Sequence, residues 1–328
     1  MPGSLTEVLD NLYTTTWQNM KETVVDNIFD ATPFWFWLKS KGKMRTVEGG
    51  RFLTEPLQYD KSDNVKWTGK GGQMPMNDQQ FLTIAKYDWR YLAGSIVRFG
   101  VDDQQNRGKN EIINFMNAKM ENLKNALISE METRLAGGSG AIAAGTTAEF
   151  PAFDGLQTLV ADVPTAEVGG INSGTDTWWK NKVTDMTGES FATYGVTRMR
   201  TMLNNTMNNL KMDMPDIIVT GQTPYEFYED NVLQYYRTSN TKLGDMGFQN
   251  IEFKGIPMVW TPSIVSRMYF LNTNFISFVY DPMMNFDLTE WKAIPNQIND
   301  RTAQIVTACA MTVSRRRCQG VIFGVATQ

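Results

Sequence analysis

The sequence predicts an α+β fold in which extended elements project from a compact body. Three patterns predict it: an apolar stripe at helical spacing over about thirty residues, two alternating segments joined by a polar glycine-rich tip, and a mixture of short strands and helices that follows. The chain has 328 residues, of which 42% are apolar and 20% charged. It can therefore bury a sizeable core.

Composition excludes several classes of chemistry. The 31 Lys+Arg are outnumbered by 35 Asp+Glu, whereas a dedicated nucleic-acid reader carries a basic excess. Without histidine there is no His general base, no Ser-His or Cys-His couple and no imidazole metal site. Cys309 and Cys318 are too few for a disulfide scaffold or a zinc site, so we expect two reduced, half-buried thiols, with a hairpin disulfide as the less favoured alternative. We expect no cofactor and no metal.

No membrane span and no signal peptide are expected. The longest wholly apolar run, Phe34–Leu38, is far shorter than the ~20 residues that cross a bilayer. The first residues, Met1–Glu7, lack a basic start and an apolar stretch. We therefore expect the protein to stay in the cell that makes it.

The first 45 residues are expected to form an amphipathic arm. Ser4 and Glu7 match a capping box, and apolar residues follow at near-helical spacing, which predicts a helix over the first thirty residues or so. Pro33 is expected to end it before an aromatic cluster at 34–38. A basic segment follows, and a solvated loop is favoured there over phosphate contact. Its cations are Lys39, Lys41, Lys43, Arg45 and Arg51.

Residues 46–100 predict a long two-stranded ribbon. Phe81 to Leu92 alternates with the period of a strand, and a second extended segment, 51–59, precedes it across the polar tip at 61–72. Arms of about 15 to 18 residues would reach roughly 50 to 60 Å. Because an isolated ribbon is at best marginally stable in water, we expect it to lie against another surface. Two ordinary strands of a larger sheet are the alternative.

A long helix is predicted between Gln104 and Ala136. Apolar residues step by three or four over about 33 residues, or ~50 Å, and Gly137 with Gly138 ends the pattern. Charged residues fill the other positions, so only one face can be buried. We interpret the stripe as core packing rather than a cofactor site. Its members are Ile112, Met116, Met120, Leu123, Leu127, Met131 and Leu135.

A Gly-rich link precedes a second domain of mixed character. It is expected to contain a helix from about Ser190 to Lys211, a strand at 217–219 and a helix that Thr223 and Pro224 open. Long β segments follow at 304–313 and 321–325. The predicted segments are an arm at 1–45, a ribbon at 46–100, the long helix at 101–149, the mixed domain at 150–286 and a strand segment at 287–328.

Motifs for catalysis are weak. The sequence holds neither a P-loop nor a nucleophile elbow. Adjacent acids at Asp102-Asp103 and Glu229-Asp230 could in principle serve hydrolysis or bind Mg²⁺, but neighbouring residues on a helix or strand point apart. We predict no enzyme activity. A run of Arg315, Arg316 and Arg317 predicts a cationic turn that is solvated or paired with carboxylates, with phosphate contact less favoured.

The order of these elements resembles the major capsid proteins of tailed bacteriophages, which have the Hong Kong 97-like fold. Three local runs are similar as well: Pro215–Tyr228, Phe253–Val259 and Met268–Thr273. The resemblance covers nearly the whole chain. It implies that the long helix and the C-terminal strands form a peripheral domain, that 150–286 is an axial domain, and that the ribbon is an extended loop that overlies a neighbouring subunit.

The resemblance implies a virion structural protein with no catalytic role. Such proteins assemble in the host bacterial cytoplasm, through hexamers and pentamers, into an icosahedral shell around double-stranded DNA. The mild acidity suits a container that contacts DNA weakly and non-specifically. A portal and a scaffolding protein are expected, together with an optional cement protein. Because the arm starts almost at Met1, a separate scaffolding protein is implied, with a scaffolding segment removed from ahead of the arm as the alternative. No asparagine matches the cross-linking partner used by some relatives, so no cross-link is inferred.

Candidate contact residues follow from these patterns. We expect the extended apolar faces to be covered by contacts between copies of the chain. Candidates for contacts between subunits are Trp17, Trp35, Trp37, Lys61, Lys66, Trp67, Lys70, Tyr87 and Trp89. Candidates for DNA-facing or other charge contacts are Lys39, Lys41, Lys43, Arg45, Arg315, Arg316 and Arg317.

Three alternatives stay open at this point. The first is an encapsulin-like compartment, which would hold protein cargo in place of DNA. The second is a monomeric hydrolase that uses carboxylates. The third is a weak nucleic-acid-binding protein whose binding would fall steeply with salt.

Overall fold

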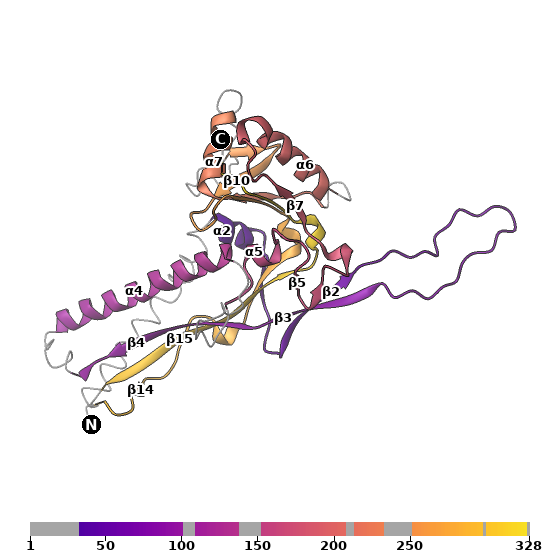
Figure 1. Cartoon of the computed structure of the whole chain (residues 1–328). Coiled ribbons are helices and arrows are strands. Elements are labelled where there is room, and N and C mark those ends of the chain that lie inside the picture. Colours follow the sequence, from indigo (N-terminus) through magenta and orange to yellow (C-terminus); the bar gives the residue numbers. More distant parts are fainter. Residues whose placement is uncertain are drawn as a thin grey trace.

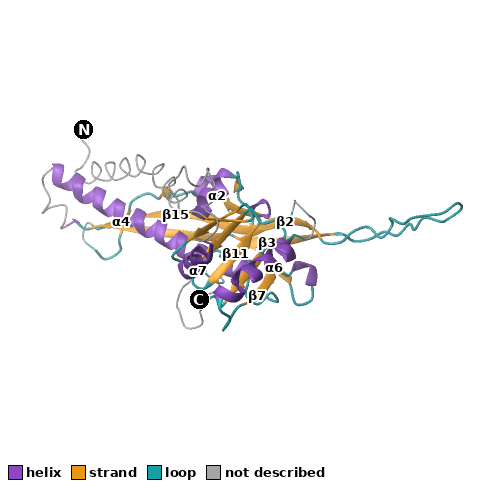
Figure 2. Ribbon diagram, turned by 90° about the horizontal axis from the view of Figure 1, so that it is seen from above, coloured by secondary structure: helices purple, strands orange, loops and turns teal. Residues whose placement is uncertain are grey.

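Two mixed sheets and an extended ribbon build the molecule (Figure 1). The computed structural model describes residues 33–100, 109–137, 152–207, 213–232, 251–297 and 300–326, without the side chains of 109–118. The predicted helix over the first thirty residues, Trp17, the Gly-rich link and the Asp102-Asp103 pair lie outside these ranges. In the described part, the long helix reaches out on one side of the body and the ribbon on the other (Figure 2).

Strand β15 (Arg301–Val313) is the central strand of the first sheet. Along one edge it pairs antiparallel with β4 (Arg90–Arg98), from Arg301 opposite Arg98 to Cys309 opposite Arg90. This confirms the predicted long strand near 304–313 and extends its start to Arg301. The other edge of β15 pairs antiparallel with three short strands: β12 (Ile276–Tyr280), β13 (Asp287–Leu288) and β14 (Lys292–Ala293). Strand β1 (Met44–Thr46) pairs parallel with β12.

Helix α4 (Lys109–Ala136) lies along this sheet. Its 28 residues span ~42 Å. The helix approaches β4 closely at Gly94, where an added Cβ would lie 2.7 Å from Leu123 Cδ1, so only glycine fits without a shift. The described part of the predicted stripe is confirmed as core, with Leu123 packed at its edge and four members buried: Met120, Leu127, Met131 and Leu135.

The second sheet has the order β7-β16-β11-β8-β10-β9. Its faces are both covered, which explains the continuous apolar run at Ile217–Val219. Ile218 packs beneath helices α6 (Val196–Thr206) and α7 (Gln222–Val232), whereas Val219 faces the core shared with the first sheet. The strands are β7 (Lys182–Asp185), β16 (Gly320–Phe323), β11 (Arg267–Leu271), β8 (Ile217–Thr220), β10 (Ile256–Trp260) and β9 (Ile251–Phe253).

The two sheets exchange strands at two crossovers. The 3₁₀ turn η4 (Thr273–Phe275) joins β11 to β12, and η6 (Arg316–Cys318) joins β15 to β16. Buried Gln319 links these crossovers, since its Oε1 accepts from Asn272 N at 2.9 Å and its Nε2 donates to Asn272 O at 3.1 Å. The sheets therefore do not follow the predicted boundary at 286/287: β12 pairs with β15, and β16 pairs with β7 and β11.

Short elements complete the body around the two sheets. Helix α2 (Pro33–Ser40) begins at Pro33, where a helix end was predicted, because proline suits a first helical turn. Trp35 of α2 lies edge-on to Phe278 at 4.8 Å between ring centroids. The others are α5 (Leu156–Leu159), the hairpin β5 (Glu167–Val168) and β6 (Ile171–Asn172), the 3₁₀ turns η1 (Thr177–Trp179) and η5 (Pro282–Met284), and the π-helical turn η2 (Phe191–Gly195).

Cys309 and Cys318 are free thiols, and both are buried rather than half-buried as predicted. Cys309 lies in the middle of the first sheet and Cys318 at the end of η6. Among the described helices, none combines the length and the apolar character needed to cross a bilayer.

Candidate inter-subunit surface

The ribbon is shorter in its paired part than predicted. Strands β2 (Phe52–Gln58) and β3 (Leu82–Asp88) pair antiparallel over seven residues each, and 59–81 continue outward as a loop (Figure 1). The predicted arms of about 15 to 18 residues are wrong because the tip is polar and rich in glycine, which gives few cross-strand apolar pairs. Trp89 separates β3 from β4. Within the alternating segment 81–92, residues 82–88 belong to the ribbon and residues from 90 onward belong to the larger sheet. The predicted ribbon is therefore correct for the first part, and the alternative of a strand in a larger sheet is correct for the second.

One face of the ribbon root is covered by the chain's own body. We define the root as β2, β3 and Tyr59. Leu53, Leu57, Ala85 and Tyr87 are buried there. Tyr87 Oη donates to Val313 O at 2.7 Å and accepts from Val313 N at 3.3 Å, and burial raises the pKa of the Tyr87 hydroxyl. This side of the root is interior.

Polar and aromatic contacts also fix the root. Glu55 pairs with Arg45 and accepts a hydrogen bond from Thr312 Oγ1 at 3.1 Å. The Tyr59 ring stacks on Trp178 with 5.4 Å between centroids. The root is thus attached on both of its strands, because Lys86 N of β3 donates to Gly169 O at 2.9 Å.

Gly169 is required at the hairpin beside the root. Its φ of +64° lies in the left-handed region, and an added Cβ would meet Ala85 Cβ at 3.0 Å and the Tyr87 ring at 3.1 Å. A larger residue would strain the backbone and push the ribbon away from the body.

The opposite face and the tip are uncovered by the described residues of the chain. Phe52, Leu82 and Ile84 are exposed on the outer face of the root. At the tip, Trp67 is fully exposed, and its neighbours Val65 and Met76 are 84% and 92% exposed. Large apolar side chains left exposed on a projecting segment indicate an interaction site. The candidate lysines Lys61, Lys66 and Lys70 are exposed along the same loop.

Four aromatic candidates for contacts between subunits lie inside this subunit. Trp35, Trp37, Tyr87 and Trp89 are all buried, so their prediction as contact residues is wrong. Trp37 Nε1 donates to Asp216 Oδ2 at 3.4 Å. The clustering of aromatic residues in these segments is a sign of core packing, because large rings contribute much of the apolar area that a fold buries.

The basic segment is a loop only in part. Lys39 lies in the last turn of α2 and Arg45 in a short strand, whereas Lys41, Lys43 and Arg51 lie in turns or loops. Met44–Thr46 forms β1 beside β12, and its cations contact the body. Lys41 Nζ lies 4.0 Å from Asp216 and over the Trp37 ring, and Lys43 Nζ donates to Asn274 O at 3.4 Å. Lys39 is exposed beside them. Much of the predicted positive charge is therefore used locally.

The three arginines of the cationic turn have different environments. Arg315 Nη1 donates to the buried Asp213 at 2.5 Å, as expected for a carboxylate-paired turn. Arg316 is fully buried, so its prediction as a surface charge contact is wrong. Its guanidinium donates to Leu159 O at 2.8 Å, Ser173 Oγ at 2.6 Å and Asn181 Oδ1 at 3.1 Å, and burial lowers its pKa to about 10. Nothing in the run Arg-Arg-Arg distinguished the buried member.

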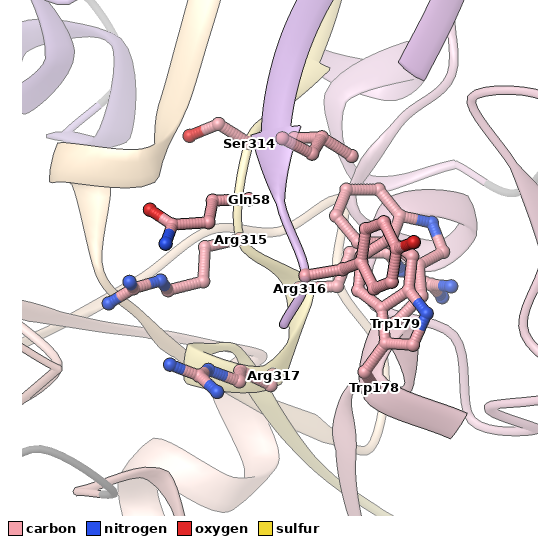
Figure 3. Close-up of a pocket in the computed structure, with 9 residues that line it drawn as sticks. Gln58, Trp178, Trp179, Ser314, Arg315, Arg316 and Arg317 are labelled. Carbon is pink, nitrogen blue, oxygen red and sulfur yellow. The ribbon is translucent and has the colours of Figure 1, made fainter. Parts of the chain in front are cut away.

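A small pocket of about 30 Å³ lies between the root and this turn (Figure 3). Only a few water molecules or one small polar group would fit. Leucine, aromatic rings and arginines line it: Leu57, Gln58, Tyr59, Trp178, Trp179, Ser314, Arg315, Arg316 and Arg317. Sequence reasoning missed this pocket because its lining comes from three separate segments.

Acidic residues do not gather into a site in the described ranges. Glu229 and Asp230 are consecutive residues of α7, so they point to different sides of the helix. No group of three or more cysteine or acidic side chains that could hold a metal ion occurs among the residues the structure describes.

No protein-family model and no curated protein matches the sequence. Solved structures do match. The capsid asymmetric unit of cyanophage A-1(L) is 15% identical with a TM-score of 0.62, over 88% of this chain and 91% of that one.

Two further matches have a TM-score of 0.51 and 10% identity. The procapsid of satellite phage P4, which includes a size determination protein, covers 94% of this chain and 91% of its own. The capsid of Myoviridae phage XM1 covers 88% and 91%. The Hong Kong 97-like label itself stays a prediction. At these identities the likeness establishes the fold, and the chain has the fold of phage capsid proteins.

Proposed function

We propose that the chain is a major capsid protein that assembles through hexamers and pentamers into an icosahedral shell enclosing double-stranded viral DNA. The observation that carries this proposal is the ribbon. It leaves the body with a covered inner face and an uncovered apolar outer face and tip, within a fold shared with phage capsids. A surface that the described chain leaves uncovered is most simply covered by a neighbouring copy.

The proposed contact residues are those that the subunit leaves exposed. Trp67, Lys61, Lys66 and Lys70 extend on the tip loop, where a neighbour's surface would meet them. Trp67 is the expected centre of this contact, because tryptophan contributes strongly when it is desolvated in an interface. The role is structural, without catalysis.

We propose weak, non-specific contact with packaged DNA. The chain's net charge of -4 disfavours tight DNA binding. Lys39, Lys41 and Lys43 are the candidate contacts, although the latter two already interact with Asp216 and Asn274. A scaffolding protein and a portal are further proposed partners, with a cement protein as an addition to the shell. Assembly would occur in the host bacterial cytoplasm.

Expression of the full chain, followed by sedimentation and electron microscopy, tests this function. We expect closed shells of uniform size. Deleting 62–74 should leave a folded subunit that no longer closes shells, since the deletion removes Trp67 but leaves the root. A matched control replaces the same residues by a Gly-Ser segment of equal length. If the deleted chain closes normal shells, the ribbon does not hold the shell together.

Nuclease-protected DNA distinguishes a virus head from a protein compartment. Particles isolated from infected cells are expected to release double-stranded DNA after nuclease treatment of the exterior. Shells that contain only protein cargo would contradict the viral role while leaving shell formation intact.

A further inference from the structure

The small pocket beside the ribbon root has a cationic mouth. Figure 3 shows Gln58, Arg315 and Arg317 extending to one side, whereas Arg316 turns toward Trp178 and Trp179. We call the space between these residues the arginine pocket. Its lining comes from the root, the η1 segment and η6 together.

Arg315 is held in place before any ligand arrives. Its Nη1 is bonded to Asp213, which is fully buried, and its Cζ lies 4.7 Å from the Phe275 ring centroid. The Arg315 side chain keeps 33% exposure. Because a guanidinium has five N–H donors, one bond to Asp213 leaves others for a second acceptor. A fixed guanidinium loses little conformational entropy when it binds.

Arg317 supplies an uncompensated positive charge. Asp213 forms an ion pair with Arg315, and Arg316 donates its hydrogen bonds to three buried acceptors. Within the described ranges, no carboxylate forms an ion pair with the partly exposed Arg317. The mouth of the pocket therefore attracts one anionic group.

The chemistry of the lining favours a carboxylate over nucleic acid. The pocket has room for one small group, and its other lining residues are uncharged: Leu57, Gln58, Tyr59, Trp178, Trp179 and Ser314. A nucleic-acid backbone binds along a series of cations, whereas this pocket offers a single cationic point. Arginine binds carboxylates with matched geometry. Copies of this chain bring an excess of acidic residues, 35 against 31 basic ones.

We propose that the arginine pocket binds an Asp or Glu side chain of a second copy of this chain. This proposal rests on the proposed shell function. The pocket lies where the ribbon leaves the body, so a neighbour under the ribbon would present its surface there. The contact would fix the angle between the ribbon and the neighbouring subunit, while the apolar tip would supply most of the surface buried between them.

Two substitutions test the pocket in the full-length chain. Arg317→Glu reverses the charge and should lower the yield of closed shells at least tenfold, with an unchanged melting temperature because Arg317 has no partner in the described subunit. Gln58→Glu places a carboxylate of nearly the same size at the mouth of the pocket. This carboxylate would pair with the arginines of its own subunit in place of the neighbour's carboxylate, so the yield of closed shells should fall as well. The matched control is Arg200→Glu, an exposed position on α6 outside the pocket, which should assemble like the wild type.

Salt and microscopy complete the test. Shell yield of the wild type should fall as NaCl rises, and the yield of Arg317→Glu should lose that dependence. A reconstruction of the wild-type shell should place a neighbour's carboxylate within 4 Å of Arg315 or Arg317 as a salt bridge would require. Equal yields for Arg317→Glu and wild type, or a phosphate or no anion at the arginines, would overturn the pocket alone. A wild type that forms no shells would overturn the proposed function as well.

Discussion

The root and the tip of the ribbon belong to one continuous segment, yet only the root is fixed by its own subunit. At the root, Tyr87 is buried and bonded to Val313, and Tyr59 stacks on Trp178. The tip loop extends far from the body (Figure 2), and Trp67 of this loop is fully exposed. An aromatic side chain therefore contributes to folding in one half of the ribbon and is available for assembly in the other.

Tyr87→Ala is the most disruptive change we predict for this comparison. It removes a buried ring and the hydrogen bonds with Val313, so the free energy of unfolding should fall by about 3 to 5 kcal/mol. Chemical denaturation of the subunit measures it. Tyr87→Phe, which keeps the ring, should lose only about 1 kcal/mol. A Tyr87→Ala subunit as stable as wild type would mean that the root is not held by the body.

Alkaline pH should weaken the body beneath the root. Burial raises the pKa of Cys309 from 9.0 to about 12. Below pH 9 the thiol is protonated in both the folded and the unfolded chain, whereas above pH 9 the unfolded chain loses the proton first. The free energy of unfolding should therefore fall as pH rises, by about 1.4 kcal/mol at pH 10 from this thiol.

Cys309→Ala isolates this effect. The difference in unfolding free energy between the variant and the wild type should change between pH 8 and pH 10. A constant difference would show that the thiol is not buried. Cys318, whose pKa burial also raises to about 12, adds a change of the same sign and is present in both proteins.

Tyr59→Leu tests the outer limit of the root. The change removes the ring stack on Trp178 and should cost about 1 kcal/mol. Thermal unfolding followed by tryptophan fluorescence reports it directly. A loss no greater than that of an exposed tip substitution would move the boundary of the fixed region inward, to β2 and β3.

Trp67→Ala should have the smallest effect on the subunit. We expect a change within about 0.5 kcal/mol, because an exposed side chain has few contacts to lose. The same substitution should reduce the yield of shells. A subunit destabilised as strongly as by Tyr87→Ala would indicate that Trp67 packs against its own chain in solution.

The sequence predicted the helices and strands better than it predicted which side chains are buried. The stripe at Met120–Leu135 has one period over many residues, so its helix and its buried face were predictable. The position of the ribbon followed from alternation and a Gly-rich tip. The length of its paired part did not, because alternation between Phe81 and Leu92 continues through Trp89, where the strand passes from the ribbon to the larger sheet.

The contact residues were less predictable because burial depends on distant segments. Trp35 is interior since Phe278, far along the chain, packs against it. Arg316 is interior because three acceptors from separate segments converge on it. Residue type alone could not distinguish Tyr87 from Trp67, and only the fold places one against Val313 and the other in solvent.

The most direct test of the central claim is a cryo-electron microscopy reconstruction of particles formed by the full-length chain. The account predicts closed shells in which the ribbon tip of each copy, with Trp67 at its centre, lies on a neighbouring copy. Monodisperse single subunits, or shells in which the tip folds back on its own body, would contradict it.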